Sequence, residues 1–192
     1  MTRSVALYGG SFNPPHVAHV MATSHVLESG AAQQVWWMPV HQHAFDEKQG
    51  SVAFSHRVAM CAHATAPFGD AVEICTIESE FPERNRTLDT LDILESRHPD
   101  TRFRLMIGAD VFAESHLWKG FDELAQRAPF IVLGRPGHAV PSPWSACTEL
   151  PDVQSRRIRD RIARGESAGE EVPPAVTSYI ESHQLYRDAG HP

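Results

Sequence analysis

Residues 8–19 read Tyr8-Gly9-Gly10-Ser11-Phe12-Asn13-Pro14-Pro15-His16-Val17-Ala18-His19. The apolar run at 5–8 stops at two glycines, which predicts a buried strand followed by a tight turn. A helical pattern from about 16 to 29 ends at Gly30, and a second apolar run follows at 35–39. A strand, a helix and a strand in this order predict a β-α-β unit with parallel strands and a right-handed crossover.

The same alternation continues along the chain. Apolar runs predict further strands at 71–77, 103–107 and 130–133. Strands that alternate with helices favour one doubly wound, Rossmann-like α/β domain with a parallel sheet, and 192 residues fit a single domain spanning 1–192. Loops and a short strand near 148–150 follow, and then a C-terminal helical segment. The predicted helices after the first lie at 54–66, 87–97, 110–115, 121–126, 153–164 and about 173–184.

The bulk composition narrows the class of protein. A net charge of −7, from 17 basic and 24 acidic residues, argues against a nucleic-acid partner. Three cysteines without a C-x-x-C pair favour a reducing compartment, and no apolar run has the length of a membrane span. We therefore expect a cytoplasmic protein without membrane or nucleic-acid partners, and a homo-oligomer is compatible with the sequence.

The turn predicted at Gly9 and Gly10 is of a kind that can bind phosphate. A strand that ends in glycine just before a helix brings backbone N–H groups to a phosphate, and the helix N-terminus adds partial positive charge. His16 and His19 are three residues apart and share one helix face. Such a histidine pair alone favours a plain structural role, but its coincidence with the glycine turn in one crossover favours phosphate binding.

These residues carry a resemblance to a known family. Residues 9–19 resemble the signature G-G-[ST]-F-[DN]-P-x-H-x-G-H of the H-x-G-H adenylyltransferases, with Ala18 where glycine is usual. Within that family the chain is most similar to nicotinate-nucleotide adenylyltransferase, and the similarity covers nearly its whole length. The further matches are F-x-x-R-x-x-M at 54–60, T-x-D-T-L at 87–91, I-G-x-D at 107–110 with Trp118 after it, and R-P-G at 135–137.

Besides Ala18, three segments depart from the family pattern. Residues 153–159 stand where the family has a second phosphate motif, I-S-S-T-x-I-R, and Gln154 and Arg156 replace a serine and a threonine. Arg86 stands where tyrosine is common. Lys48 corresponds to the lysine of the family's phosphate loop, although the usual P-H-K triplet is absent.

The resemblance implies a reaction, a cofactor and a set of site residues. It implies transfer of AMP from ATP to nicotinate mononucleotide, giving deamido-NAD and pyrophosphate in NAD biosynthesis, with Mg²⁺ accompanying ATP and no dedicated metal site. His16 and His19 would be catalytic. The implied ATP-binding residues are Gly9, Gly10, Ser11, Phe12, His16, His19, Lys48, Gly108, Asp110, Ser155, Arg156 and Arg159. The implied acceptor-binding residues are Arg86, Thr87, Trp118 and Arg135.

Several alternatives stay open. The same chemistry could act on nicotinamide mononucleotide or on another phosphate acceptor such as phosphopantetheine. The changes at Ala18, Gln154 and Arg156 would also suit a non-catalytic nucleotide-binding protein, which retention of both motif histidines opposes. The 12 histidines raise metal binding as a weaker idea, although they lack metal-site spacing with cysteine or carboxylate partners. Asp110 could also serve as an N-cap of the helix that follows it.

Overall fold

The computed structural model describes residues 3–41, 51–81, 86–112, 120–140 and 146–187. The strands are β1 (Arg3–Gly10), β2 (Gln34–Pro39), β3 (Val72–Ile74), β4 (Thr101–Gly108), β5 (Phe130–Gly134) and β6 (Ala146–Glu149). The helices are α1 (Val17–Glu28), α2 (Phe54–Thr65), α3 (Thr87–Arg97), α4 (Ala109–Phe112), α5 (Phe121–Arg127), α6 (Ser155–Ala163) and α7 (Pro174–Ser182). Two 3₁₀ helices, η1 (Ala66–Ala71) and η2 (Ile77–Glu80), flank β3.

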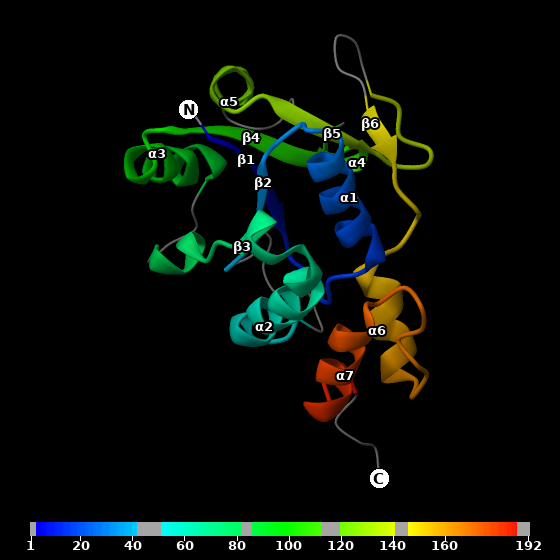
Figure 1. Ribbon diagram of the computed structural model, residues 1–192. Coiled ribbons are helices and arrows are strands. Elements are labelled where there is room, and N and C mark those ends of the chain that lie inside the picture. The colour runs from blue at the N-terminus through cyan, green and yellow to red at the C-terminus, as the bar shows by residue number, and fades with distance from the viewer. Residues whose placement is uncertain (1–2, 42–50, 82–85, 113–119, 141–145, 188–192) are drawn as a thin grey trace.

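The strands form one parallel sheet in the order β3-β2-β1-β4-β5-β6 (Figure 1). This order reverses between β1 and β4, as in a doubly wound fold. The predicted Rossmann-like α/β class is therefore confirmed, together with the C-terminal helices α6 and α7, which lie below the sheet in Figure 1.

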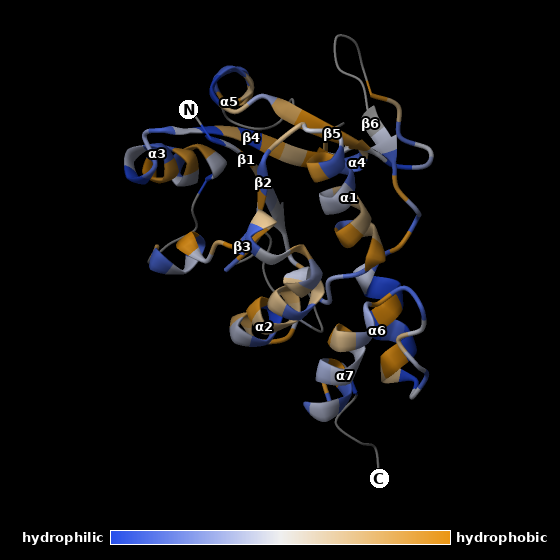
Figure 2. Ribbon diagram, in the orientation of Figure 1, coloured by the Kyte–Doolittle hydropathy of each residue, from blue (hydrophilic) through white to orange (hydrophobic). Residues whose placement is uncertain are grey.

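Alternating side chains of the strands supply a core on each face of the sheet. Ala6 and Tyr8 of β1 belong to the core that α1, α2, α6 and α7 cover, whereas Val5 and Leu7 belong to the core under α3 and α5. Successive side chains of a strand point to opposite faces, so a continuous apolar run is the pattern of a strand buried on both sides. Figure 2 shows such hydrophobic colour along β4 and β5.

Strand β3 is shorter than the sequence predicts. The apolar alternation predicted a strand over 71–77, but β3 pairs with β2 only at Val72–Ile74. The N–H of Cys75 makes one further bond to the Trp37 carbonyl, and the chain then turns into η2. That turn brings Glu78 to the end of β2, where it accepts a hydrogen bond from the backbone N–H of His41 at 3.1 Å.

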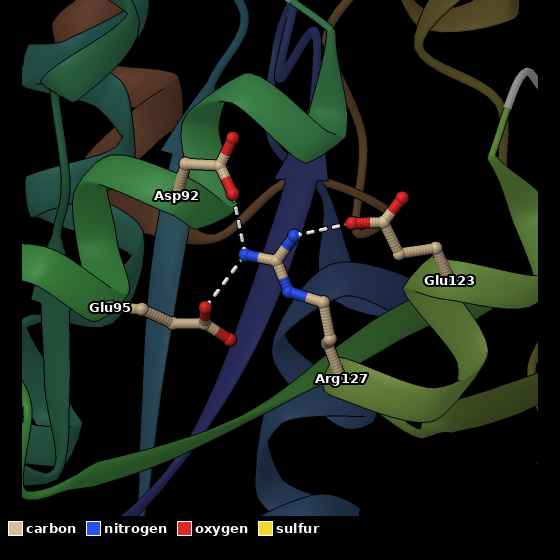
Figure 3. A network of polar contacts seen from close by, with 4 residues as sticks. All are labelled: Asp92, Glu95, Glu123 and Arg127. Atoms are coloured by element: carbon tan, nitrogen blue, oxygen red, sulfur yellow. Dashed lines mark hydrogen bonds and ion pairs between the residues drawn. The ribbon is translucent and has the colours of Figure 1, made fainter.

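An arginine network joins α3 to α5. Arg127 of α5 donates to Asp92 at 2.5 Å and Glu95 at 2.6 Å on α3, and to Glu123 at 2.8 Å on its own helix (Figure 3). The Arg127 side chain is 27% exposed, so water screens these pairs only in part. The network fixes α3, whose N-terminus lies beside the functional site described below.

Candidate functional site

The site lies where β1 and β4 end side by side at the centre of the sheet. The chain after β1 enters α1 on one face, whereas the chain after β4 enters α4, whose buried Ala109 and Phe112 belong to the core of the other face. Connections that diverge in this way open a crevice outside the carboxyl ends of the strands. Two cavities flank the loop that leaves β1 here.

The larger cavity has a volume of about 1020 Å³. It lies between the loop after β1, the start of α4, the residues after β5 and the N-terminal half of α6. A cavity of this size and with this many polar side chains suits a charged ligand as large as a nucleoside triphosphate. The predicted site residues that line it are Ser11, His16, His19, Asp110, Arg135, Ser155, Arg156 and Arg159.

His16 and His19 face this cavity from the start of α1. Their ring centroids are 3.7 Å apart, and the backbone N–H of His16 donates to Nδ1 of His19 at 3.1 Å. Because Nδ1 of His19 accepts this bond, the neutral ring carries its proton on Nε2 and can donate it to a ligand. Nδ1 of His16 is buried without a hydrogen-bond partner in the described part of the chain. Buried polar atoms are normally hydrogen-bonded, so this nitrogen is a candidate for a hydrogen bond with a ligand or a water molecule.

Both imidazoles are neutral at physiological pH. Burial, and then the positive charge of Arg135, lower the pKa of His16 to about 3. Burial lowers the pKa of His19 well below its usual value, with further lowering by His16 and Arg135. The two neutral rings can therefore offer hydrogen bonds to a ligand, whereas they carry no positive charge of their own.

Phe12 gives the loop its shape. Its φ of +46° lies in the left-handed region, which favours glycine. The ring is buried and stacks on Trp37 with 4.6 Å between centroids, which holds this backbone conformation in place. Phe12 thus lines neither cavity with its ring, so any ligand contact it makes comes from its backbone.

Asp110 and Arg135 meet across the larger cavity. The Oδ1 atom of Asp110 lies 3.8 Å from Nε of Arg135, and both atoms are buried without a hydrogen-bond partner among the described residues. A Cβ at Gly108 would collide with Oδ1 of Asp110, so the carboxylate can sit here only because residue 108 is glycine. Asp110 lies inside α4 rather than at its N-cap.

The start of α6 holds the phosphate loop. Ser155 donates from Oγ to the Pro14 carbonyl at 2.8 Å, and Arg159 donates from Nη1 to the Asn13 carbonyl at 2.9 Å. Arg156 is exposed on the cavity side, whereas its neighbour Arg157 is paired with Asp152 at 2.9 Å. Helix α6 therefore holds the loop through Ser155 and Arg159, and it also places the cation of Arg156 at the cavity.

The smaller cavity has a volume of about 280 Å³ and lies on the other side of the loop. Gly9, Gly10 and Gly108 line it, together with Thr87 at the first turn of α3 and mainly apolar side chains from the strands. Glu78 lines it as well, and burial raises the pKa of this carboxyl above its usual range, against the opposing effects of the His41 N–H and Arg57. Its apolar walls suit a flat ring better than a polyphosphate.

Some predicted site residues lie elsewhere. Arg86 is exposed at the N-cap of α3 and lines neither cavity, while Arg135, expected near the acceptor, lines the larger cavity. Lys48 and Trp118 lie outside the described residues. Ala18 is buried in the core, so its extra methyl group faces away from both cavities.

Several residues at or beside the two cavities were not predicted as part of the site. Asn13 and Tyr186 line the larger cavity, where the Tyr186 hydroxyl donates to Oδ1 of Asn13 at 2.8 Å. Glu78 lines the smaller cavity, and Arg57 lies beneath the loop between the two. The sequence offered one signal for them, since Asn13 and Arg57 fall inside the motifs at 9–19 and 54–60.

Two features of the described part of the chain bear on metal binding and on membrane insertion. Within the described ranges, no group of three or more His, Cys, Asp or Glu side chains is placed to hold a metal ion. Among the described helices, none is both long enough and apolar enough to cross a membrane.

Known proteins are similar to this chain in sequence and in fold. The model of the cytidylyltransferase-like family matches residues 7–161. A Myxococcus xanthus protein named "Probable nicotinate-nucleotide adenylyltransferase" is 40% identical over 182 residues, which are 95% of this chain and 94% of that protein. A Salinibacter ruber protein of the same name is 36% identical over 192 residues, with 96% and 98% covered.

A solved structure supports the fold. Nicotinic acid mononucleotide adenylyltransferase of Plasmodium falciparum, complexed with NaAD, matches with a TM-score of 0.79 at 18% identity, covering 96% of this chain and 97% of that one. The family match over most of the chain defines the class of protein, a cytidylyltransferase-like nucleotidyltransferase. Within this class, the chain belongs to the nicotinate-nucleotide adenylyltransferase family.

Proposed function

We propose that the protein transfers AMP from ATP to nicotinate mononucleotide, releasing pyrophosphate and forming deamido-NAD in NAD biosynthesis. The observation that carries this proposal is the pair of cavities on either side of residues 9–11, with two neutral histidines lining the larger one. The names of the relatives support the same reaction. A transferase that joins two nucleotides needs one site for each of them beside a shared reacting centre.

The larger cavity is proposed to take ATP. His16 and His19 would donate to the phosphate oxygens, and the loop from Gly10 to Phe12 would add backbone N–H groups. Arg156 would meet the outer phosphates, and Ser155 and Arg159 would add contacts beside their bonds to the loop. Asp110 would orient the nucleotide through its ribose, and Lys48 would assist from the segment before α2.

The smaller cavity is proposed to take the pyridine ring of the acceptor. Thr87 would supply a polar contact at the N-terminus of α3, where the helix dipole favours a negatively charged group. Trp118 would stack on the ring, and Arg86 and Arg135 would offer charge to the acceptor's carboxylate or phosphate. Gly9 and Gly108 would let the ring approach the sheet because neither carries a side chain.

The chemistry requires no strong general base. A phosphate monoester has a second pKa of about 6, so at neutral pH its oxygen is already largely deprotonated and can attack the α-phosphorus. Catalysis then depends on aligning the two phosphates and stabilising the charge that develops. Neutral His16 and His19 can supply that stabilisation as hydrogen-bond donors.

Mg²⁺ is proposed to accompany ATP. Asp110 lines the larger cavity, and its carboxylate is a hard oxygen ligand of the kind that Mg²⁺ prefers. Because the described residues offer no group of three ligands, phosphate oxygens and water would complete the coordination. When bound, the ion neutralises part of the triphosphate charge.

The decisive experiment offers both pyridine mononucleotides. The protein is incubated with ATP, Mg²⁺ and either nicotinate or nicotinamide mononucleotide, and dinucleotide and pyrophosphate are measured. Dinucleotide is expected with nicotinate mononucleotide, and the absence of product from both acceptors would refute the proposal. His16→Ala is expected to lower kcat by about 10²-fold or more, the size of effect seen when a transition-state donor is lost.

We propose the cytoplasm as the place of this reaction. Cys61 and Cys75 are free thiols, which suits a reducing compartment. ATP and a pyridine mononucleotide are the proposed partners, and the net charge of −7 argues against a nucleic-acid partner.

A further inference from the structure

Arg57 is a buried arginine beneath the phosphate loop. Only 3% of the residue is exposed, and its Nη1 donates to the Ser11 carbonyl at 3.0 Å. Its guanidinium carbon lies 5.3 Å from the ring centroid of Phe54, and its Nε is buried without a partner among the described residues. Burying a guanidinium with an unpartnered N–H destabilises the fold, so an apolar side chain at this position would favour stability more than arginine does.

The bond to Ser11 fixes the direction of one peptide group. The peptide between Ser11 and Phe12 is trans, since Asn13-Pro14 is the cis bond recorded in the described chain. In a trans peptide the C=O and the N–H point in opposite directions. With the Ser11 carbonyl turned toward Arg57, the Phe12 N–H points away from Arg57.

This peptide lies at the boundary between the two cavities. Gly9 and Gly10 line the smaller cavity and Ser11 lines the larger one. Phe12 is held in a left-handed conformation with φ of +46°, which a phenylalanine does not adopt without support. The ring supports it from one side by stacking on Trp37, and Arg57 holds the preceding carbonyl.

We propose that Arg57 is a positioning residue for the transfer reaction, which holds the Ser11–Phe12 peptide so that the Phe12 N–H binds the phosphate group undergoing transfer. The kinetic part of this proposal rests on the proposed function. The binding part requires only that the larger cavity takes a polyphosphate. Arg57 acts through the loop and does not itself touch the substrate.

Arg104 provides a matched control. It also donates from Nη1 to a backbone carbonyl, that of Ala31, at 2.9 Å, but at the opposite end of the sheet. Arg57→Met and Arg104→Met therefore each remove one guanidinium-to-carbonyl bond and keep an unbranched side chain. Arg57→Gln is a second variant for the case in which Arg57→Met does not fold, because the shorter amide does not reach the same carbonyl.

Two measurements separate positioning from stability. Arg57→Met is expected to lower kcat/KM by about 10²-fold, mainly through kcat, because small misplacements of reacting groups have effects of this size. Arg104→Met is expected to lower the melting temperature and leave kcat/KM unchanged. In ¹H–¹⁵N spectra, the Phe12 amide of the wild type should shift when inorganic pyrophosphate or ATP is added, and this shift should be lost in the Arg57 variants.

These measurements can either support or overturn the positioning role of Arg57. A wild-type kcat/KM in a folded Arg57 variant would overturn the positioning role, as would equal loss in the Arg57 and Arg104 variants. A wild-type Phe12 amide that does not respond to pyrophosphate or ATP would overturn it as well, whatever reaction the enzyme performs. If the amide responds and the response depends on Arg57 but no dinucleotide forms, the proposed function fails and the role of Arg57 in phosphate binding stands.

Discussion

The left-handed conformation of Phe12 predicts an unusual order of stability among its variants. Phe12→Ala and Phe12→Gly both remove a ring that is 1% exposed and stacked on Trp37 at 4.6 Å. Loss of a buried phenylalanine ring costs about 3–5 kcal/mol. The two variants differ only in the Cβ, which alanine keeps at a φ of +46° and glycine does not.

The difference between the two variants can be worked out from two opposing terms. A Cβ in the left-handed region costs about 1–2 kcal/mol, and glycine avoids this cost. Glycine loses about 0.5–1 kcal/mol through the greater entropy of its unfolded chain. Phe12→Gly should therefore be more stable than Phe12→Ala by about 0.5–1 kcal/mol, although it removes more atoms.

Urea unfolding of four variants tests this order. Phe103 is the matched control, because it is 3% exposed and lies in the regular strand β4. There the ordinary order holds, so Phe103→Ala should be more stable than Phe103→Gly by about 0.5–1 kcal/mol. If alanine is also the more stable replacement at position 12, the backbone there is not strained, and the account of how the ring and Arg57 hold the loop is wrong.

Three further perturbations have expected outcomes. The pKa of His16 is about 3 in the folded protein against 6.5 ordinarily, so the unfolded chain binds more protons and stability falls as pH drops from about 6.5 toward 3. The free energy of unfolding, measured with urea at pH 7.5, 6.5 and 5.5, should fall less steeply in His16→Gln than in the wild type, by at most about 1.4 kcal/mol per pH unit. The same dependence on pH in both proteins would contradict the lowered pKa of His16. Arg127→Met should cost about 1–2 kcal/mol of stability and less at high salt, as three partly screened pairs are lost, and equal cost at low and high salt would argue against an ionic origin. Thr23→Val should cost about 1–3 kcal/mol, because it leaves the buried Nε1 of Trp37 without the 2.8 Å bond to Thr23, and a neutral effect in thermal unfolding would show that water replaces the hydroxyl.

The sheet was predictable because its signal is local. Each apolar run buried on both faces ends near a glycine or a proline, and the helix Thr87–Arg97 has the bounds that its leucine spacing predicts. Strand β3 was overestimated because apolar residues continue to Ile77, whereas pairing stops at Ile74. Alternation reports which side chains are buried, and hydrogen bonding to a neighbouring strand depends on where that neighbour ends.

The candidate site was predictable in composition but not in arrangement. His16, His19, Asp110 and Arg135 were each identified from motifs, and the structure brings all four to one cavity. That Gly9 and Gly10 line the other cavity could not be read from their spacing, because the direction in which a loop faces depends on what packs behind it. Nothing in the sequence around Glu78 predicted that it lines a cavity, because its position depends on the turn of the chain after β3.

The shape of the phosphate loop comes from outside the 9–19 motif. Its carbonyls accept hydrogen bonds from Arg57, 46 residues from Ser11, from Ser155, 141 residues from Pro14, and from Arg159, 146 residues from Asn13. Bonds over such separations leave no periodicity in a sequence.

The same bonds explain where departures from the family pattern are tolerated. Ser155 and Arg159, which match the second phosphate motif, are the residues that hold the loop. The departures fall at Gln154, which bonds to Asp152 at 3.0 Å, and at Arg156, which is exposed on the cavity side. Because neither change removes a bond to the loop, the placement of His16 and His19 at the larger cavity does not depend on either departure.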